Sequence, residues 1–197
     1  HEYGDGGTSM DSLKGQLLLA GAGLHDPNFH RTVVLIAEHS DEGALGLVLN
    51  RPAHVSVGEA APPLGSLVEP DEPVFVGGPV DSQALIVLAE FEEPEDAASL
   101  VLGNIGFLPA ETDAEPETRR ARVFAGYSGW SAGQLEAELE EDAWIIEPPR
   151  PDDVFLDPMC GSGTIVIERA LAGRHGCILG GDADPNALDA TRGNVGP

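Results

Sequence analysis

The stretch TVVLIAEHSDEGALGLVLN, from Thr32 to Asn50, decides the fold of this chain. Its first part is rich in β-branched and other apolar residues, the polar residues Ser40–Gly43 interrupt it, and an apolar run resumes at Ala44. Two apolar runs on either side of a short polar loop predict a β-hairpin. Arg51-Pro52 is expected to end the hairpin, because a proline has no backbone N–H to donate to the ladder.

Further strands are expected on both sides of this hairpin. Apolar and β-branched runs predict them at residues 16–23, 73–80, 83–91 and 120–130. Residues 56–68 are expected to hold a short helix that Pro62-Pro63 interrupts, residues 92–100 a turn or a short helix start, and residues 109–118 a polar loop. Strands that cluster and connect through short loops favour an antiparallel α+β layout.

One helix is predicted within residues 131–144. Ser131 and Gln134 have capping-box spacing, in which the hydroxyl accepts a hydrogen bond from the third helical amide while the glutamine side chain reaches back. An apolar stripe is expected at Ala132, Leu135 and Leu139. The glutamates between them, Glu136 and Glu138, are expected to face water.

The chain is strongly acidic, which limits its partners. Acidic residues outnumber basic ones 34 to 10, giving a formal net charge of −24. Direct binding of nucleic acid is therefore not expected, because a polyanion is repelled unless basic residues gather in one patch. The dense basic cluster of Arg119, Arg120 and Arg122 is flanked by acids, and we interpret it as a solvated strand edge.

Targeting and redox signals are weak. No segment is long enough to cross a membrane as a helix. The two cysteines, Cys160 and Cys177, make neither a disulfide framework nor a zinc site, so a reduced cytoplasmic location is the simplest interpretation. Residues 1–9 have no apolar period and are expected to be a disordered leader or a remnant added for expression, with Met10 as the natural start.

Five pieces follow one another between residue 13 and about residue 155: GQLLLA, DPNFHRTVVLIAEHS, GALGLVLNRP, VFVGGPV and GYSGWSAGQLEAEL. In this order and spacing they resemble the AlgH/YqgE family of small bacterial proteins. The resemblance implies a compact α+β domain over residues 10–153, with an antiparallel, barrel-like sheet surrounded by helices. It also implies a non-catalytic protein, often described as a transcriptional regulator, that binds a protein partner or a small ligand and requires no cofactor.

Two groups of residues suggest catalysis or metal binding. Ser128 in GYSGW lies between a strand and a helix like a nucleophile elbow, but Trp130 occupies the place of the last glycine. We therefore interpret this segment as a turn that Trp130 anchors in the core. The second group comprises possible metal ligands: His25, Asp26, His30, Glu38 and His39. Their spacing does not put two ligands on one helix face, so no metal site is assigned. No catalytic residue is assigned in either group.

Asp26 precedes a proline and is expected to cap a turn. Glu38 and His39 are neighbours in a strand and are expected to point to opposite faces.

A partner or ligand groove is the remaining candidate site in this part of the chain. The turns at NRP and GGP reverse the chain, and we hypothesise that they converge with the strand end at GYSGW on one groove. The groove residues would be Asn50, Arg51, Gly77, Gly78, Tyr127 and Trp130.

The stretch VFLDPMCGSGTIVIERAL (Val154–Leu171) opens a different pattern. Its DPMCGSGT core resembles motif I of the S-adenosylmethionine-dependent RNA and DNA methyltransferases, and residues 154–197 resemble a Rossmann-like βαβ(α) segment. In such a segment the cofactor, S-adenosylmethionine, lies against the glycine turn and the acids that end the strands. The matching residues are Asp157, Gly161, Gly163 and Asp182.

Three interpretations of this segment remain open. It is a fragment of a methyltransferase that binds cofactor without a substrate site, because no Asp/Asn-Pro-Pro-aromatic motif follows motif I. It is the tail of a fusion or chimera with no activity of its own. Or it packs as the closing elements of the AlgH-like domain, with Thr164–Gly173 as the last helix and Ile178 and Leu179 extending the sheet. The crossover between the two resemblances is expected at residues 152–155.

Overall fold

The computed structural model describes residues 11–110 and 115–155. The predicted leader, the predicted closing helix and strand, and the four predicted cofactor residues Asp157, Gly161, Gly163 and Asp182 lie outside these residues. Within them, no helix is long and apolar enough to cross a membrane.

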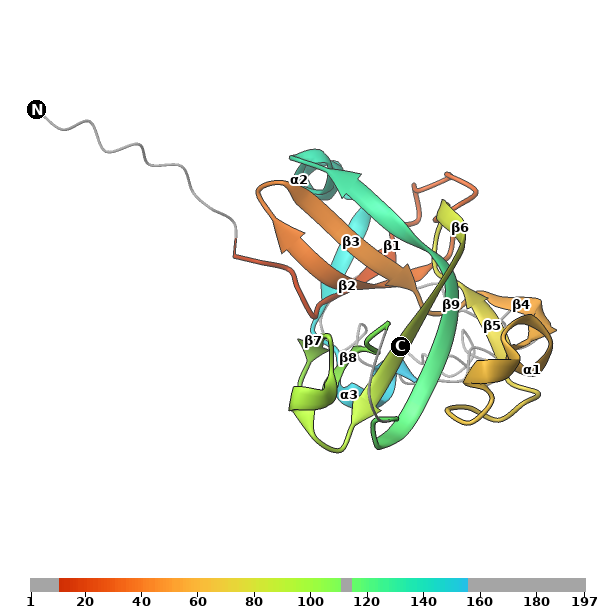
Figure 1. Cartoon of the computed structure of the whole chain (residues 1–197). Coiled ribbons are helices and arrows are strands. Elements are labelled where there is room, and N and C mark those ends of the chain that lie inside the picture. The colour runs from red at the N-terminus through yellow and green to blue at the C-terminus, as the bar shows by residue number, and fades with distance from the viewer. Residues whose placement is uncertain (1–10, 111–114, 156–197) are drawn as a thin grey trace, which may run out of the picture.

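The described residues form a 10-stranded sheet with a few short helices (Figure 1). The strands are β1 (Leu17–Ala20), β2 (Val33–Ser40), β3 (Gly43–Val48), β4 (Pro52–Ser56), β5 (Pro73–Val76), β6 (Val80–Phe91), β7 (Ser99–Leu102), β8 (Ile105–Phe107), β9 (Thr118–Ser131) and β10 (Trp144–Glu147). The helices are α1 (Val57–Ala60), α2 (Gln134–Glu140) and α3 (Pro151–Val154), with single 3₁₀ turns at Pro62–Leu64 and Pro94–Asp96.

The long strand β9 organises the sheet. The strand order is β10-β1-β2-β3-β9-β6-β8-β7, and all of these pairs are antiparallel. On one edge β9 pairs with β6, and on the other it pairs first with β5, in parallel, and then with β3. The strand thus joins two halves of the sheet, and Figure 1 shows it running the length of the molecule.

The hairpin predicted over residues 32–50 is confirmed. Strands β2 and β3 pair from Val34 opposite Val48 to Ser40 opposite Gly43, with one irregularity between Ile36 and Glu38. Arg51-Pro52 follows the hairpin as expected, but Pro52 also begins β4, which the sequence analysis missed. A proline is tolerated there because it is the first residue of the strand.

Three hydrophobic clusters fill the spaces on the two faces of the sheet. The central cluster lies between the two halves and includes Leu35, Leu47, Phe75, Leu88 and Phe124. A second cluster, under α2, gathers around Trp130 and Trp144. A third cluster, under α1 and the turn after it, gathers around Val57, Phe91 and Val123. Because both faces of β2 are covered, Val34 to Ala37 are all buried and the strand lacks a simple alternation of apolar and polar residues.

The expectation of a sheet surrounded by helices is wrong for the described residues. The longest helix there has 7 residues, and the other two have 4 residues each. The sheet covers its own apolar surface because its two halves enclose the central cluster. On the outer face Phe29, from a loop, stacks on Trp130 at 5.7 Å between ring centroids.

Strands β7, β8 and β10 were also missed. Each is only three or four residues long, which is too short for a periodic pattern to stand out. Strands β7 and β8 pair around Gly103, whose φ of 56° lies in the left-handed region that glycine adopts without strain.

Candidate functional site

Asn50 and Arg51, two residues of the predicted groove, hold the loop before β2. The Asn50 side chain accepts from the Val33 N–H at 3.0 Å and donates to the Arg31 carbonyl. The Arg51 guanidinium donates to the backbone carbonyls of Pro27, Asn28 and His30. Burial lowers the pKa of Arg51, and the charge of Asp26 opposes that shift. These bonds give both side chains a structural task in the loop.

An Arg51→Lys variant tests this task. A lysine keeps the charge but lacks the planar fork that reaches three carbonyls, so we expect a loss of about 1–2 kcal/mol in the free energy of unfolding. Amide hydrogen exchange at residues 28–31 should accelerate more than exchange elsewhere. Arg31→Lys, an exposed change in the same loop, is the control. Unchanged exchange in Arg51→Lys would contradict the assignment.

The turn at Gly77 and Gly78 marks a close approach of backbones. The Gly77 N–H donates to the Ala125 carbonyl, and the Gly77 carbonyl accepts from the Val48 N–H and from the Ser128 hydroxyl. Ser128 is fully buried, so its hydroxyl is occupied by the fold and is out of contact with solvent.

Tyr127 is half-buried and packs against the central cluster, next to Gly78. The backbone of Arg51 joins this region, since its carbonyl accepts from the Val76 N–H. Trp130 instead lies in the cluster under α2, where it is 5% exposed. The structure therefore brings five of the six predicted groove residues to one region and places Trp130 in the core, where it anchors the turn as interpreted from the sequence.

Glu136 and Glu138 of α2 are only partly exposed, because side chains of other elements bond to them. Glu138 Oε2 accepts from both buried indoles, from Trp130 Nε1 at 2.9 Å and from Trp144 Nε1 at 2.8 Å. Glu136 Oε1 bonds to His39 Nε2 at 2.8 Å, and a bond from its own backbone N–H and this histidine lower the pKa of Glu136. Amphipathic periodicity does not predict these bonds, because their partners lie on other elements.

Two details of α2 also differ from the prediction. Gln134 Oε1 does reach back to the Ser131 N–H, but the Ser131 hydroxyl bonds to that same oxygen instead of capping an amide. The helix begins after Gly133, whose φ is 76°. Ala132 is exposed, so only Leu135 and Leu139 of the predicted stripe pack on the sheet.

The suspected metal ligands do not form a cluster, and several of them make hydrogen bonds within the fold. Asp26 caps its turn, with Oδ1 accepting from the Asn28 N–H at 2.8 Å. His39 Nδ1 accepts from the Leu13 N–H, while Glu38 is exposed on the other face of β2. Among the described residues, no group of three or more His, Cys, Asp or Glu side chains is placed to hold a metal ion.

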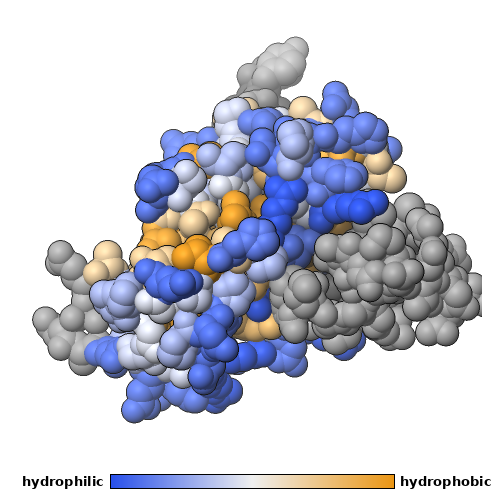
Figure 2. Space-filling model, turned by 90° about the vertical axis from the view of Figure 1, so that its right-hand side faces the viewer, coloured by the Kyte–Doolittle hydropathy of each residue, from blue (hydrophilic) through white to orange (hydrophobic). Residues whose placement is uncertain are grey.

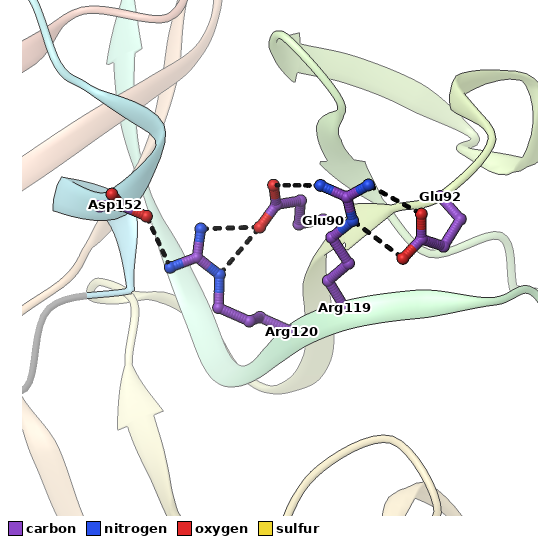
Figure 3. Close-up of polar contacts among 5 residues, drawn as sticks. All are labelled: Glu90, Glu92, Arg119, Arg120 and Asp152. Atoms are coloured by element: carbon purple, nitrogen blue, oxygen red, sulfur yellow. Dashed lines mark hydrogen bonds and ion pairs between the residues drawn. The ribbon is translucent and has the colours of Figure 1, made fainter.

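The arginines of β9 line an open cleft, which we call the arginine cleft. It has a volume of about 460 Å³ and is lined by Gly65–Pro70, Glu72, Arg119–Arg122 and Phe155. Arg119 donates twice to Glu92, and Arg120 binds Glu90 and Asp152 (Figure 3). The arginine charges in Figure 3 are thus matched by carboxylates of the chain itself, which does not favour an anion site.

The interpretation of these arginines as a solvated strand edge is wrong for Arg122, which is 5% exposed. Arg119 is exposed, and beside Arg119, Arg120 and Arg122 the described strand partner of β9 is β6 alone. The Arg122 guanidinium carbon lies 4.2 Å from the centre of the Phe75 ring, and Nη1 donates to the Val154 carbonyl. The acids that pair with Arg119 and Arg120 are not their neighbours in the sequence. They are Glu90 and Glu92 of β6 and Asp152, which links α3 to β9.

Glu72 lies in the same cleft, and burial raises its pKa, although the charge of Arg122 opposes this. A raised pKa in the folded state means that stability falls as the pH rises through the titration of Glu72. We therefore expect Glu72→Gln to be at least as stable as the parent at neutral pH, and to lose that advantage near pH ~4. Thermal unfolding across this range checks it, with exposed Glu69→Gln as the control. A variant less stable than its parent at neutral pH would contradict the expectation.

The second cleft, which we call the apolar groove, has a volume of about 420 Å³. All of its lining residues are apolar: Leu45, Leu64, Leu85, Ile86, Val87, Phe107, Leu108, Pro109 and Ala110. Leu85 is 42% exposed, which is high for a leucine inside a strand. Figure 2 shows a face of the molecule on which hydrophobic surface lies between hydrophilic residues.

None of the predicted groove residues lines either cleft. The sequence analysis missed the apolar groove because QALIVLAEF reads as an evenly apolar strand. Only the pairing partners decide which of its residues stay open to solvent.

The fold and its clefts define a small, sheet-rich α+β domain of mostly antiparallel strands. The AlgH-like family profile matches residues 17–162. A UPF0301 protein of Mycobacterium tuberculosis is 41% identical over 165 residues, covering 79% of this chain and 81% of that protein. A UPF0301 protein of Mycolicibacterium vanbaalenii is 38% identical over 163 residues, with the same coverage. The chain therefore belongs to the AlgH-like family.

Solved structures agree with this assignment. The solution structure of the AlgH protein from Pseudomonas aeruginosa is similar with a TM-score of 0.63 and 29% identity, covering 87% of this chain and 98% of that one. The crystal structure of a protein from Corynebacterium diphtheriae has a TM-score of 0.65 and 26% identity, covering 73% and 79%. A second profile, described as an RMKL-like methyltransferase domain, matches residues 133–194 and overlaps the first.

Proposed function

We propose that this protein is a non-catalytic binding protein and that a protein partner binds in its apolar groove. The exposed Leu85, within a groove lined by apolar residues alone, carries this proposal. Contiguous apolar surface in contact with water is unfavourable and typically marks an interaction site. Burial of that surface by a partner would return this free energy.

The state of the reactive side chains supports the same proposal. The Ser128 hydroxyl is buried and bonds to a backbone carbonyl, and His39 bonds to Leu13 and Glu136. Nucleophilic or general-base catalysis needs such groups to be accessible to a substrate. Their involvement in the fold favours binding over catalysis.

A role in transcription fits this proposal only through a protein partner. The net charge of −24 opposes direct contact with DNA, and the arginines of β9 are matched by carboxylates. The acidic surface instead favours a basic protein by long-range attraction. Regulation would then operate on that partner.

The proposal is tested with a displayed library of random peptides. Peptides enriched on the full chain should bind it in solution, and Leu85→Glu should weaken them at least about tenfold because a carboxylate enters the apolar groove. Leu100→Glu is the matched control, since Leu100 is similarly exposed, at 37%, but lies outside the groove. A failure to enrich peptides, or equal binding to both variants, would overturn the proposal.

Binding of S-adenosylmethionine is a second candidate function, favoured by the methyltransferase profile that extends to residue 194. Asp157, Gly161, Gly163 and Asp182 would contact the cofactor. Calorimetry with the full chain should then detect binding that Asp182→Ala abolishes and Asp184→Ala retains. An absence of heat at millimolar cofactor would remove this candidate.

A further inference from the structure

The apolar groove lies beside an open stretch of sheet edge. One edge of β6 pairs with β9 from Val80 to Phe91. Its other edge pairs with β8 only from Leu88 to Glu90, and the Leu108 N–H adds one bond to the Val87 carbonyl. Among the described strands, none continues along this edge toward Leu85. In Figure 1, β6 extends well beyond the short strands β7 and β8.

The backbone of Leu85 faces this open edge. The Phe91 N–H donates to the Asn104 carbonyl and the Val87 carbonyl accepts from Leu108, so the odd-numbered residues direct their polar groups toward β8. The register with β9 is continuous from Leu85 to Glu90, which keeps this alternation intact. The N–H and C=O of Leu85 are therefore the next pair in the ladder, at a position that β8 does not reach.

The groove offers apolar contacts on both faces of that edge. Ile86 and Phe107 pack against the central cluster, as does Leu45, whereas Leu64 and Leu108 pack against the cluster under α1. A strand directs alternate side chains to opposite faces, so a strand added here would find apolar contacts for both sets. A helix would present one face and could not use both sides of the sheet edge.

We propose that the partner binds as an extended basic segment that adds a strand to β6, which rests on the proposed function of the groove. Strand addition supplies backbone hydrogen bonds, and the groove supplies contacts for alternate side chains. The segment carries lysine or arginine next to its apolar residues, because the chain has a net charge of −24. The same charge disfavours a second copy of this chain as the occupant, since two such molecules repel each other.

The probe is the peptide Lys-Lys-Val-Ile-Val-Lys-Lys, acetylated and amidated, titrated into the full chain. Two further peptides carry a single backbone N-methyl group, one at the isoleucine and one at the valine after it. In a paired strand successive N–H groups point to opposite edges. One methylated peptide should therefore lose at least about tenfold in affinity while the other stays near the parent. Equal effects of the two methyl groups would overturn the strand pairing.

Charge and site have their own controls. Replacing the four lysines by glutamates should abolish binding, and raising the salt from roughly 50 mM to roughly 500 mM should weaken the lysine peptide severalfold. Binding of the glutamate peptide as tightly as the lysine peptide would overturn the basic occupant. If the chain self-associates in the ultracentrifuge and the Leu85→Glu variant is monomeric, the occupant is a second copy of the chain. That result would overturn the basic segment as the occupant.

The outcomes also separate this inference from the proposed function. If Leu85→Glu abolishes peptide binding but both methylated peptides bind like the parent, the groove is a binding site and strand addition is wrong. If the peptides bind equally well to the parent, Leu85→Glu and Leu100→Glu, the groove itself is not the site.

Discussion

A Gly78→Ala variant is expected to be strongly destabilised. A Cβ at residue 78 would lie 2.2 Å from both the carbonyl carbon and the carbonyl oxygen of Tyr127. These are backbone atoms of the central strand β9, so they cannot rotate away as the end of a side chain does. The two backbone segments must therefore move apart. The Gly77 N–H donates to the Ala125 carbonyl right beside this contact.

We expect a loss of more than about 3 kcal/mol in the free energy of unfolding, which is a large part of the total for a domain of this size. Urea denaturation measures it. Gly23→Ala is the matched control, because a Cβ at residue 23 meets nothing within 4 Å. Equal denaturation midpoints for the two variants would show that β5 and β9 do not approach as described.

A Glu138→Ala variant is also expected to be strongly destabilised. The carboxylate accepts from both indole N–H groups, and Trp130 and Trp144 are only 5% and 4% exposed. Its removal leaves two buried donors without their acceptor, at a cost of about 1–3 kcal/mol each. We therefore expect a loss of roughly 2–6 kcal/mol in the free energy of unfolding.

Tryptophan fluorescence provides the readout specific to this contact. The chain has two tryptophans and both belong to the cluster, so their emission should shift to longer wavelength as water reaches them. Glu140→Ala removes an exposed glutamate from the same helix and is the control. Glu138→Gln keeps one acceptor oxygen and should fall between the two. An unchanged spectrum and stability in Glu138→Ala would contradict the assignment.

The contrast between the hairpin and the helix shows which features the sequence could predict. The hairpin over residues 32–50 is a local pattern, in which two apolar runs and a polar loop leave one plausible pairing. The hydrogen-bond partners of Glu136 and Glu138 are His39, Trp130 and Trp144, and no residue spacing along the helix predicts them. Short strands such as β7, β8 and β10 could not be predicted from the sequence for a related reason, since their stability depends on neighbouring strands.

The arginines and the groove show the same division at the candidate site. The acids next to Arg119 and Arg120 suggest a solvated surface in the sequence. The fold instead pairs the two arginines with Glu90, Glu92 and Asp152, which are distant in the sequence. Nothing in QALIVLAEF distinguishes the exposed Leu85 from its buried neighbour Val87. That distinction arises because β8 ends before it reaches Leu85.

By itself, the sequence determined the strand-rich antiparallel layout, the central hairpin, the anchoring of Trp130 and the acidity that disfavours a polyanion. Family resemblance over residues 13–155 belongs with these, because it too depends on local order along the chain. Only the tertiary structure decided which apolar residues stay open, which charges are neutralised and where two backbones touch. The physical reason is that exposure, ion pairing and steric contact are properties of pairs of segments, and residues far apart in sequence supply the other member of each pair.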